Sequence, residues 1–216
     1  MMNVFENKKG KIILLKMVKT IQENKVYLGD LDGLIGDGDH GMNMNKGFSL
    51  FEKRYCKNDF RFTDGLKNLG MLLMNEIGGS MGPIYGTIFT GMAEASEKLE
   101  TISLKDFSEI LEAGYNGLME IVEARAGDKT LVDTLFPTLK SLKTDVVLGV
   151  DFVVALDKMK AAAKQGSEST KDMVARYGRS SRLGERSRGV LDTGSVSCYL
   201  ILAAMADGIK EILEEL

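Results

Sequence analysis

The sequence has little of the residue types that most often mark a metal or redox site. It contains one histidine, two cysteines and no tryptophan among 216 residues. Cys56 and Cys198 lie far apart and form no CxxC pair, so neither a disulfide framework nor a cysteine-ligated zinc site is expected. We interpret both as free buried thiols in a reducing compartment.

An excess of positive charge is also missing. The 28 basic and 31 acidic side chains give a net charge of −3, which excludes a general basic field for nucleic acid or anionic lipid. The apolar run Ile12–Leu15 ends at Lys16, and it is too short for a signal-peptide core or a membrane span. The sequence therefore predicts a cytoplasmic protein in which any polyanion binds at a local site.

Proline is scarce, with two residues in the chain, and helical periodicity dominates instead. Leu14, Val18 and Ile21, for example, fall on one face of a helix. Only residues 146–154 look β-prone, and one short run cannot form a sheet. We predict an all-α fold and a single domain over residues 1–216.

Eight helices are expected, and short connections favour an antiparallel up-and-down bundle. The predicted ranges are 9–28, 40–56, 63–77, 82–98, 104–124, 130–143, 150–175 and 194–215. In such a bundle the loops after helices one, three, five and seven emerge at the same end. Those loops hold most of the clustered glycine, so that end is expected to carry the function, although single glycines commonly end helices.

The first of these loops, GDLDGLIGDGDHG, is acidic. Asp30, Asp32, Asp37 and Asp39 lie within ten residues, and their mutual repulsion would be relieved by Mg²⁺ or Ca²⁺, which prefer oxygen ligands. Neither the EF-hand nor the P-loop pattern matches. The alternative is a solvated acidic turn in which Asp39 caps the next helix.

Two helix starts near glycine are candidate anion sites. His40, the only histidine, opens the second predicted helix, and Asn43 follows one turn later, where free N–H groups can bind phosphate. The loop GGSMG precedes the fourth helix, and Pro83 suits a first helical turn. A tight interhelical turn would explain this second loop equally well.

The last loop is rich in arginine, a side chain that pairs with phosphate through two parallel bonds. Within thirteen residues it carries Arg176, Arg179, Arg182, Arg186 and Arg188. Its length and glycine content favour a lid over a ligand, whereas the alternative is a solvated surface run. Asp192, Thr193 and Gly194 then open the last helix, which is another N-terminal ligand position.

Four segments together resemble the motifs of a known family. LGDLDGLIGDGDHGMNM resembles the metal-binding signature of the nucleotide-binding L subunit of dihydroxyacetone kinase. GGSMGPIYGT, AGDKTLVDTL and GRSSRLGERSRGVLDTGS resemble its later signatures, in the family's order and over nearly the whole chain. The chain length is similar to that of the separate subunit of the phosphotransferase-system-dependent enzyme. The ATP-dependent kinases instead fuse this domain to a substrate domain.

The resemblance implies a barrel of eight antiparallel helices with ADP or ATP bound at one end under a lid. It implies two Mg²⁺ ions held by Asp32, Asp37 and Asp39. It also implies nucleotide contacts at His40, Gly41, Met42, Asn43, Met81, Gly82, Leu131, Arg179, Asp192, Thr193 and Gly194. Leu131 would cover the adenine and Arg179 would reach a phosphate. No side chain is assigned as a catalytic base.

The resemblance also implies partner subunits. In this family a phosphohistidine on the carrier M subunit recharges bound ADP to ATP. The γ-phosphoryl then passes to dihydroxyacetone on the substrate-binding K subunit, a step of glycerol metabolism. Phosphoryl transfer of this kind depends mainly on positioning and charge neutralisation.

The sequence departs from the family pattern at four positions. Met42 stands where the family usually has threonine, Met81 replaces serine, Arg182 replaces tyrosine and Thr193 replaces proline. Two alternatives therefore stay open. One is the nucleotide-binding part of another ketose or triose kinase, or of a fatty-acid kinase. The other is a non-catalytic homologue that binds a transcriptional regulator.

Overall fold

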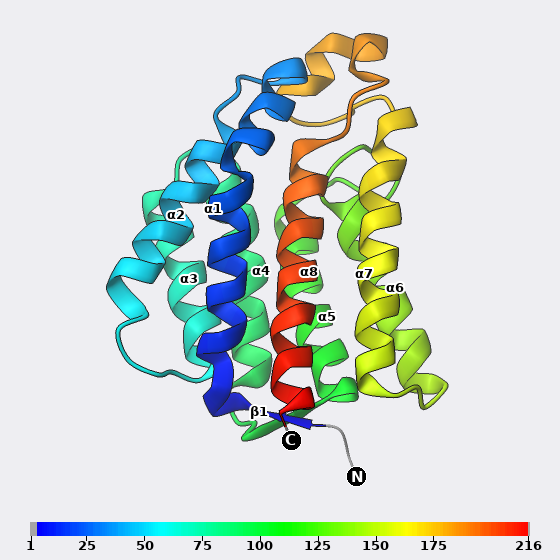
Figure 1. Cartoon of the computed structure of the whole chain (residues 1–216). Coiled ribbons are helices and arrows are strands. Elements are labelled where there is room, and N and C mark those ends of the chain that lie inside the picture. The colour runs from blue at the N-terminus through cyan, green and yellow to red at the C-terminus, as the bar shows by residue number, and fades with distance from the viewer. Residues whose placement is uncertain (1–3, 216) are drawn as a thin grey trace.

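The computed structural model describes residues 4–215, and α-helices dominate it (Figure 1). The helices are α1 Gly10–Ile35, α2 His40–Tyr55, α3 Phe62–Glu76, α4 Met81–Ser96, α5 Leu104–Ile121, α6 Val132–Val147, α7 Phe152–Ser169 and α8 Thr193–Glu214. The short elements are β1 Val4–Glu6, β2 Thr101–Ser103 and the 3-10 helices η1 Asn7–Lys9, η2 Thr170–Asp172 and η3 Arg179–Ser187. The predicted all-α fold is confirmed.

Neighbouring helices run antiparallel around a common apolar core, and α8 packs against α1 to close the ring (Figure 1). The helices α1, α3, α5 and α7 therefore end where α2, α4, α6 and α8 begin. The predicted up-and-down topology, with four loops gathered at one end, is confirmed. Across residues 4–215, no helix combines the length and the apolar character needed to cross a membrane.

The other end of the barrel is closed by two short strands and a buried polar network. β1 pairs antiparallel with β2, with Phe5 opposite Ile102. Asn7 then donates from Nδ2 to Thr63 Oγ1 (2.9 Å) and to the Leu99 carbonyl (2.6 Å). Its amide oxygen accepts a hydrogen bond from the Thr63 N–H (3.2 Å). These bonds fix the end of the barrel that lies opposite the glycine-rich loops.

The run at residues 146–154, which looks β-prone in the sequence, forms no strand in the structure. α6 continues through Val147, and α7 begins at Phe152. Gly149 makes the turn between them with a φ of 63°, a conformation that glycine adopts without strain. The run is apolar because its valines belong to two helix ends and the turn between them.

Two helix ends at the glycine-rich end differ from the prediction. α1 continues to Ile35 because Leu28, Leu31 and Ile35 extend its buried stripe, so Asp32 lies in a helix and not in a loop. α7 ends at Ser169, earlier than predicted, and the chain from 170 to 192 forms the lid that contains η2 and η3. The acidic loop itself is therefore short and is fixed at both ends by helices.

Candidate functional site

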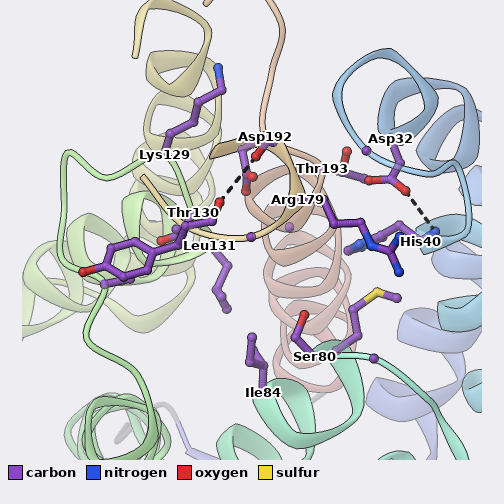
Figure 2. A pocket seen from close by; sticks show the side chains of 18 of the residues that line it. Asp32, His40, Ser80, Ile84, Lys129, Thr130, Leu131, Arg179, Asp192 and Thr193 are labelled. Carbon is purple, nitrogen blue, oxygen red and sulfur yellow. Dashed lines mark hydrogen bonds between the residues drawn. The ribbon is translucent and has the colours of Figure 1, made fainter. Parts of the chain in front are cut away.

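A pocket of about 520 Å³ opens at the end where the even-numbered helices begin (Figure 2). Its lining comes from the α1–α2 loop, the start of α4, the segment between α5 and α6, the lid and the start of α8. Its volume lies within the range of small-molecule sites. The structure therefore brings together the four loops that the sequence pattern assigned to one end.

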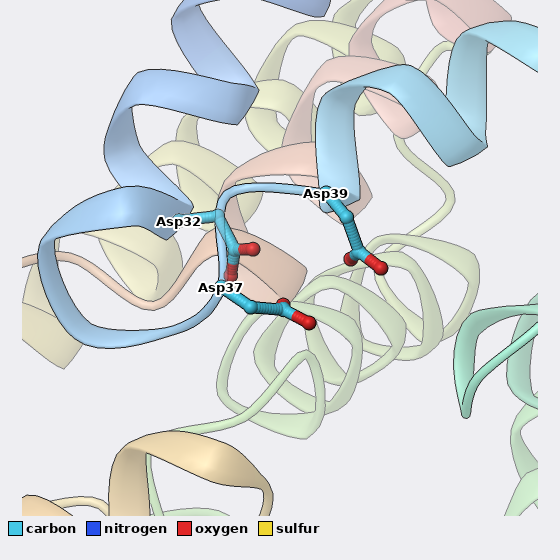
Figure 3. Close-up of side chains that lie close together, drawn as sticks. All are labelled: Asp32, Asp37 and Asp39. Carbon is cyan, nitrogen blue, oxygen red and sulfur yellow. The ribbon is translucent and has the colours of Figure 1, made fainter.

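Three carboxylates form an acidic cluster on one side of the pocket (Figure 3). One oxygen each from Asp32, Asp37 and Asp39 lies within 4.8 Å of the others. Asp32 Oδ2 accepts hydrogen bonds from the N–H groups of Gly38 (2.8 Å) and His40 (3.4 Å). These bonds wrap the short loop around the Asp32 carboxylate, and three converging carboxylates can hold a hard divalent cation.

One part of the alternative, an aspartate that caps α2, does not match this geometry. Asp39 stands at the N-cap position of α2, but its side chain accepts no hydrogen bond from the helix. Desolvation raises the pKa of Asp32, and the charges of Asp37 and Asp39 add to the rise, against the lowering by the backbone hydrogen bonds. A bound cation would offset both the desolvation of Asp32 and its repulsion by Asp37 and Asp39.

The lid reaches this cluster through one arginine. Arg179, the first residue of η3, places its guanidinium 2.8 Å from Asp37 Oδ2. Two other lid arginines are held by local ion pairs, Arg176 with Asp128 (3.1 Å) and Arg188 with Glu185 (3.0 Å). Among the lid arginines, Arg179 lines the pocket, so it can contact an anion bound beside the carboxylates.

Two helix starts without a side-chain cap lie at the same pocket. Neither Asp39, before α2, nor Ser80, before α4, makes a side-chain cap. The His40 N–H already donates to Asp32 Oδ2, but the two first turns lack a side-chain cap, and the positive end of a helix favours an anion. The Ser80 side chain lines the pocket beside Met81, so a hydroxyl lies next to the position where the family usually has serine.

His40 lines the pocket and is held in place by a chain of polar contacts. Its Nε2 lies 2.9 Å from Ser197 Oγ, which lies 2.6 Å from the Tyr85 hydroxyl. The Tyr85 hydroxyl also donates to the Gly194 carbonyl (3.2 Å). Burial lowers the pKa of His40 to about 4, so the ring is neutral at pH 7. The chain connects the starts of α2, α4 and α8.

The opposite side of the pocket is apolar and includes Ile84, Ile121, Val122 and Leu131. Figure 2 shows Leu131 and Ile84 on the side away from Asp32 and His40. Ile121 is 52% exposed because α5 ends there at the pocket. The pocket thus suits a ligand with one anionic part and one flat apolar part.

Most of the predicted site residues line this pocket. They are Asp32, Asp37, Asp39, His40, Asn43, Met81, Leu131, Arg179, Asp192, Thr193 and Gly194. Gly41, Met42 and Gly82 do not line it. A Cβ on Gly41 would lie 1.9 Å from the Lys25 carbonyl oxygen, and one on Gly82 would lie 2.4 Å from the Ile77 carbonyl oxygen. These two glycines allow close backbone packing, and the Met42 side chain is 59% exposed.

Three residues that shape the site were not predicted from the sequence. Tyr85 and Ser197 form the contacts below His40, and Lys129 is a buried lysine beside the lid. Lys129 lies within the AGDKT segment, which was the only signal for it in the sequence. The contacts of all three residues join segments far apart in the chain.

Comparison with known proteins agrees with these observations. The family model described as the DAK2 domain matches residues 34–207. The chain is 39% identical to "PEP-dependent dihydroxyacetone kinase 1, ADP-binding subunit DhaL" of Listeria innocua serovar 6a, over 86% of this chain and 88% of that protein. It is 38% identical to the ADP-binding subunit DhaL of the PEP-dependent dihydroxyacetone kinase of Escherichia coli, over 86% of this chain and 89% of that protein.

The fold also matches a solved structure. The crystal structure of the dihydroxyacetone kinase from C. freundii in complex with AMP-PNP and Mg²⁺ superposes with a TM-score of 0.69 at 22% identity. The match covers 93% of this chain and 33% of that longer one. The chain therefore belongs to the DAK2-domain family, among the DhaL-type subunits of PEP-dependent dihydroxyacetone kinases.

Proposed function

We propose that this chain carries ADP and ATP with two Mg²⁺ ions and relays a phosphoryl group between two partner subunits. The donor is a phosphohistidine on the carrier M subunit, and the acceptor is dihydroxyacetone held by the K subunit in the cytoplasm. One observation carries the proposal. The carboxylate cluster, two uncapped helix starts and an apolar wall face a single pocket.

The residues present fit the metal ions. Asp32, Asp37 and Asp39 supply only oxygen ligands, which suits Mg²⁺, and a bound cation would offset their mutual repulsion. When bound, the ions offset the charge that develops on the β- and γ-phosphates during transfer. Asp37 also faces Arg179 across the mouth of the pocket, so a nucleotide bound there would be contacted from the lid as well.

The nucleotide lies along the pocket from its acidic side to its apolar side. The positive ends of α2 and α4 lie beside the phosphates, and Asn43 and the Ser80 hydroxyl line the same part of the pocket. The adenine packs on Leu131 and Ile84, which line the far side. This arrangement explains why one pocket combines carboxylates, helix starts and aliphatic side chains.

Each transfer exchanges one bond to phosphorus for another. In the first, the P–N bond of the phosphohistidine breaks as a P–O bond forms to the β-phosphate of ADP. In the second, the γ-phosphoryl leaves ATP and a P–O bond forms to the sugar hydroxyl, which loses its proton. His40 has a pKa of about 4 and contacts Ser197, so it is a poor base. We assign the base to the subunit that holds the sugar.

The dependence of nucleotide binding on Mg²⁺ can be tested by calorimetric titration of ADP into the protein with and without Mg²⁺. We expect Asp37→Asn to weaken ADP binding in Mg²⁺ by about 100-fold, since one cation ligand is lost. Asp30→Asn is the matched control because Asp30 is an exposed aspartate of α1 outside the cluster. ADP binding that needs no Mg²⁺, or that Asp37→Asn leaves unchanged, contradicts the proposal.

The relay is tested separately with the purified K and M subunits. Mixing them with this chain, a catalytic amount of ADP and the phosphodonor should yield dihydroxyacetone phosphate. Asp37→Asn should abolish this product and Asp30→Asn should not. Product formation that does not need this chain would show that the relay is wrong, even if the nucleotide binds.

A further inference from the structure

Lys129 has a buried ammonium group beside the lid. Its side chain is 1% exposed. Nζ donates hydrogen bonds to the carbonyl oxygens of Thr170 (2.6 Å), Met173 (3.2 Å) and Val190 (2.5 Å). Figure 2 shows the side chain directed away from Asp32 and His40. Lys129 therefore serves something other than the acidic side of the pocket.

The three acceptors lie at both ends of the lid. Thr170 and Met173 begin the lid segment, and Val190 lies near its end. We call the two ends of the lid, residues 170–173 and 189–192, the neck. Further hydrogen bonds join its two sides: Gly189 N–H donates to the Lys171 carbonyl (2.8 Å), and Asp192 N–H donates to Thr170 Oγ1 (3.0 Å). Lys129 reaches this neck from outside the lid, from the segment between α5 and α6, whose Asp128 also pairs with Arg176 of the lid.

Both the backbone conformation and the burial of Lys129 are energetically unfavourable. Lys129 has a φ of 61°, in the left-handed region that residues other than glycine avoid. Desolvation by burial lowers its pKa. The turn that contains Lys129 is held by Asp133, whose carboxylate accepts hydrogen bonds from the N–H groups of Gly127 (2.5 Å) and Thr130 (2.8 Å). An ammonium group has three donors, and here three carbonyl groups receive them.

The part of the lid that faces the pocket lies between the two sides of the neck. Between its two sides lie Tyr177, Gly178, Arg179 and Ser180, all of which line the pocket. Arg179 reaches Asp37 at 2.8 Å. If the two sides of the neck separate, these residues lose one of the anchors that keep them over the site, and the ion pairs of Arg179 with Asp37 and Arg176 with Asp128 remain.

We propose that Lys129 is a positioning residue that clamps the two ends of the lid and thereby slows the release of bound nucleotide. The release part rests on the proposed nucleotide binding. The clamp part rests only on the three carbonyl contacts and the position of the lid. Lys129 itself contacts neither the phosphates nor the reacting atoms in this account.

The test compares Lys129→Met with Lys171→Met. Methionine keeps the length of the side chain but has no ammonium group. Lys171 is an exposed lysine of the same neck, which takes part through its backbone carbonyl. Two rates are measured: cleavage of the lid by an arginine-specific protease, and release of the fluorescent analogue mant-ADP in Mg²⁺. We expect both rates to rise about tenfold in Lys129→Met and to stay unchanged in Lys171→Met.

A general loss of folding is separated from loss of the clamp by two checks. Cleavage at Arg54, which lies outside the lid, and the thermal unfolding midpoint should both stay close to those of the wild type. If Lys129→Met fails these checks, Lys129→Gln, which keeps two N–H donors on a shorter side chain, takes its place and is expected to show the same two increases.

Two results would overturn the proposal. One is lid cleavage as slow in the Lys129 variant as in the wild type. The other is faster cleavage with unchanged mant-ADP release, because the lid would then not control release. A wild-type protein that binds no mant-ADP in Mg²⁺ would refute the proposed function and the release part together, and the cleavage rates would still decide whether Lys129 clamps the lid.

Discussion

At the scale of single residues, the site contains a carboxyl group whose ionisation opposes folding. Asp192 caps α8 by accepting a hydrogen bond from Ser195 N–H (2.7 Å). Desolvation nevertheless raises its pKa from 3.8 to about 7. The folded chain therefore binds this proton more tightly than the unfolded chain. Between about pH 4 and pH 7 this residue lowers the free energy of unfolding as the pH rises.

Asp192→Asn should remove this pH dependence, because asparagine also caps helices and does not titrate. We expect the free energy of unfolding of the wild type, relative to the variant, to fall between pH 4 and pH 8 by at most about 4 kcal/mol. Urea denaturation in EDTA at several pH values measures the difference, and all other titrating groups cancel. Parallel curves for the two proteins would show that Asp192 is ionised with an ordinary pKa.

At the scale of helices, the start of α2 depends on a close crossing with α1. The family resemblance assigned Gly41 to the phosphates, but the structure packs it against α1, whose end carries Asp32. The absence of a side chain at Gly41 thus brings the first turn of α2 beside the acidic cluster. One glycine links helix packing to the geometry of the site.

Gly41→Ala should reduce the free energy of unfolding by about 3 kcal/mol, since its Cβ would lie 1.9 Å from the Lys25 carbonyl oxygen and the helices must separate. Gly33→Ala is the matched control in α1. A Cβ there meets nothing within 4 Å, and alanine should stabilise the helix by up to about 1 kcal/mol. Urea denaturation of both variants decides, and equal effects would exclude a tight crossing.

The helices themselves could be predicted, because apolar residues such as Leu14 and Ile21 repeat at helical spacing and are buried. The end of α1 could not, because Gly29 and Gly33 look like loop residues although the helix continues through them. Strands of three residues, such as β1, are too short to show alternation. Local pattern predicts an element well only where the element is long.

The site was predictable where its residues are close in sequence. Asp32, Asp37 and Asp39 lie within eight residues, so their spacing alone predicted a cluster of carboxylates that could hold a cation. The contact between His40 and Ser197 spans 157 positions, and those of Lys129 reach 41 to 61 positions along the chain. Such contacts arise only when the barrel closes, and a single sequence gives no direct signal for them.

At the scale of the whole molecule, the barrel separates its stabilising end from its binding end. The Asn7 network and the two strands lie opposite the pocket. Asn7→Ala removes hydrogen bonds to Thr63 and Leu99, and we expect a loss of about 2 kcal/mol in the free energy of unfolding. The affinity for ADP in Mg²⁺ should stay unchanged below the unfolding temperature. Calorimetric titration of the variant checks this, and weaker binding would show that the two ends are coupled.

Asp39→Asn should have the opposite combination of effects. In EDTA the variant loses one of three mutually repelling carboxylates and no helix cap, so its free energy of unfolding should rise by about 0.5 kcal/mol. With Mg²⁺ and ADP the order should reverse, because a ligand that binds only the folded state stabilises it in proportion to its affinity. Thermal unfolding of both proteins in the two buffers tests this. If the variant is less stable than the wild type in EDTA, the three carboxylates stabilise the apoprotein, and their closeness does not reflect selection for a cation.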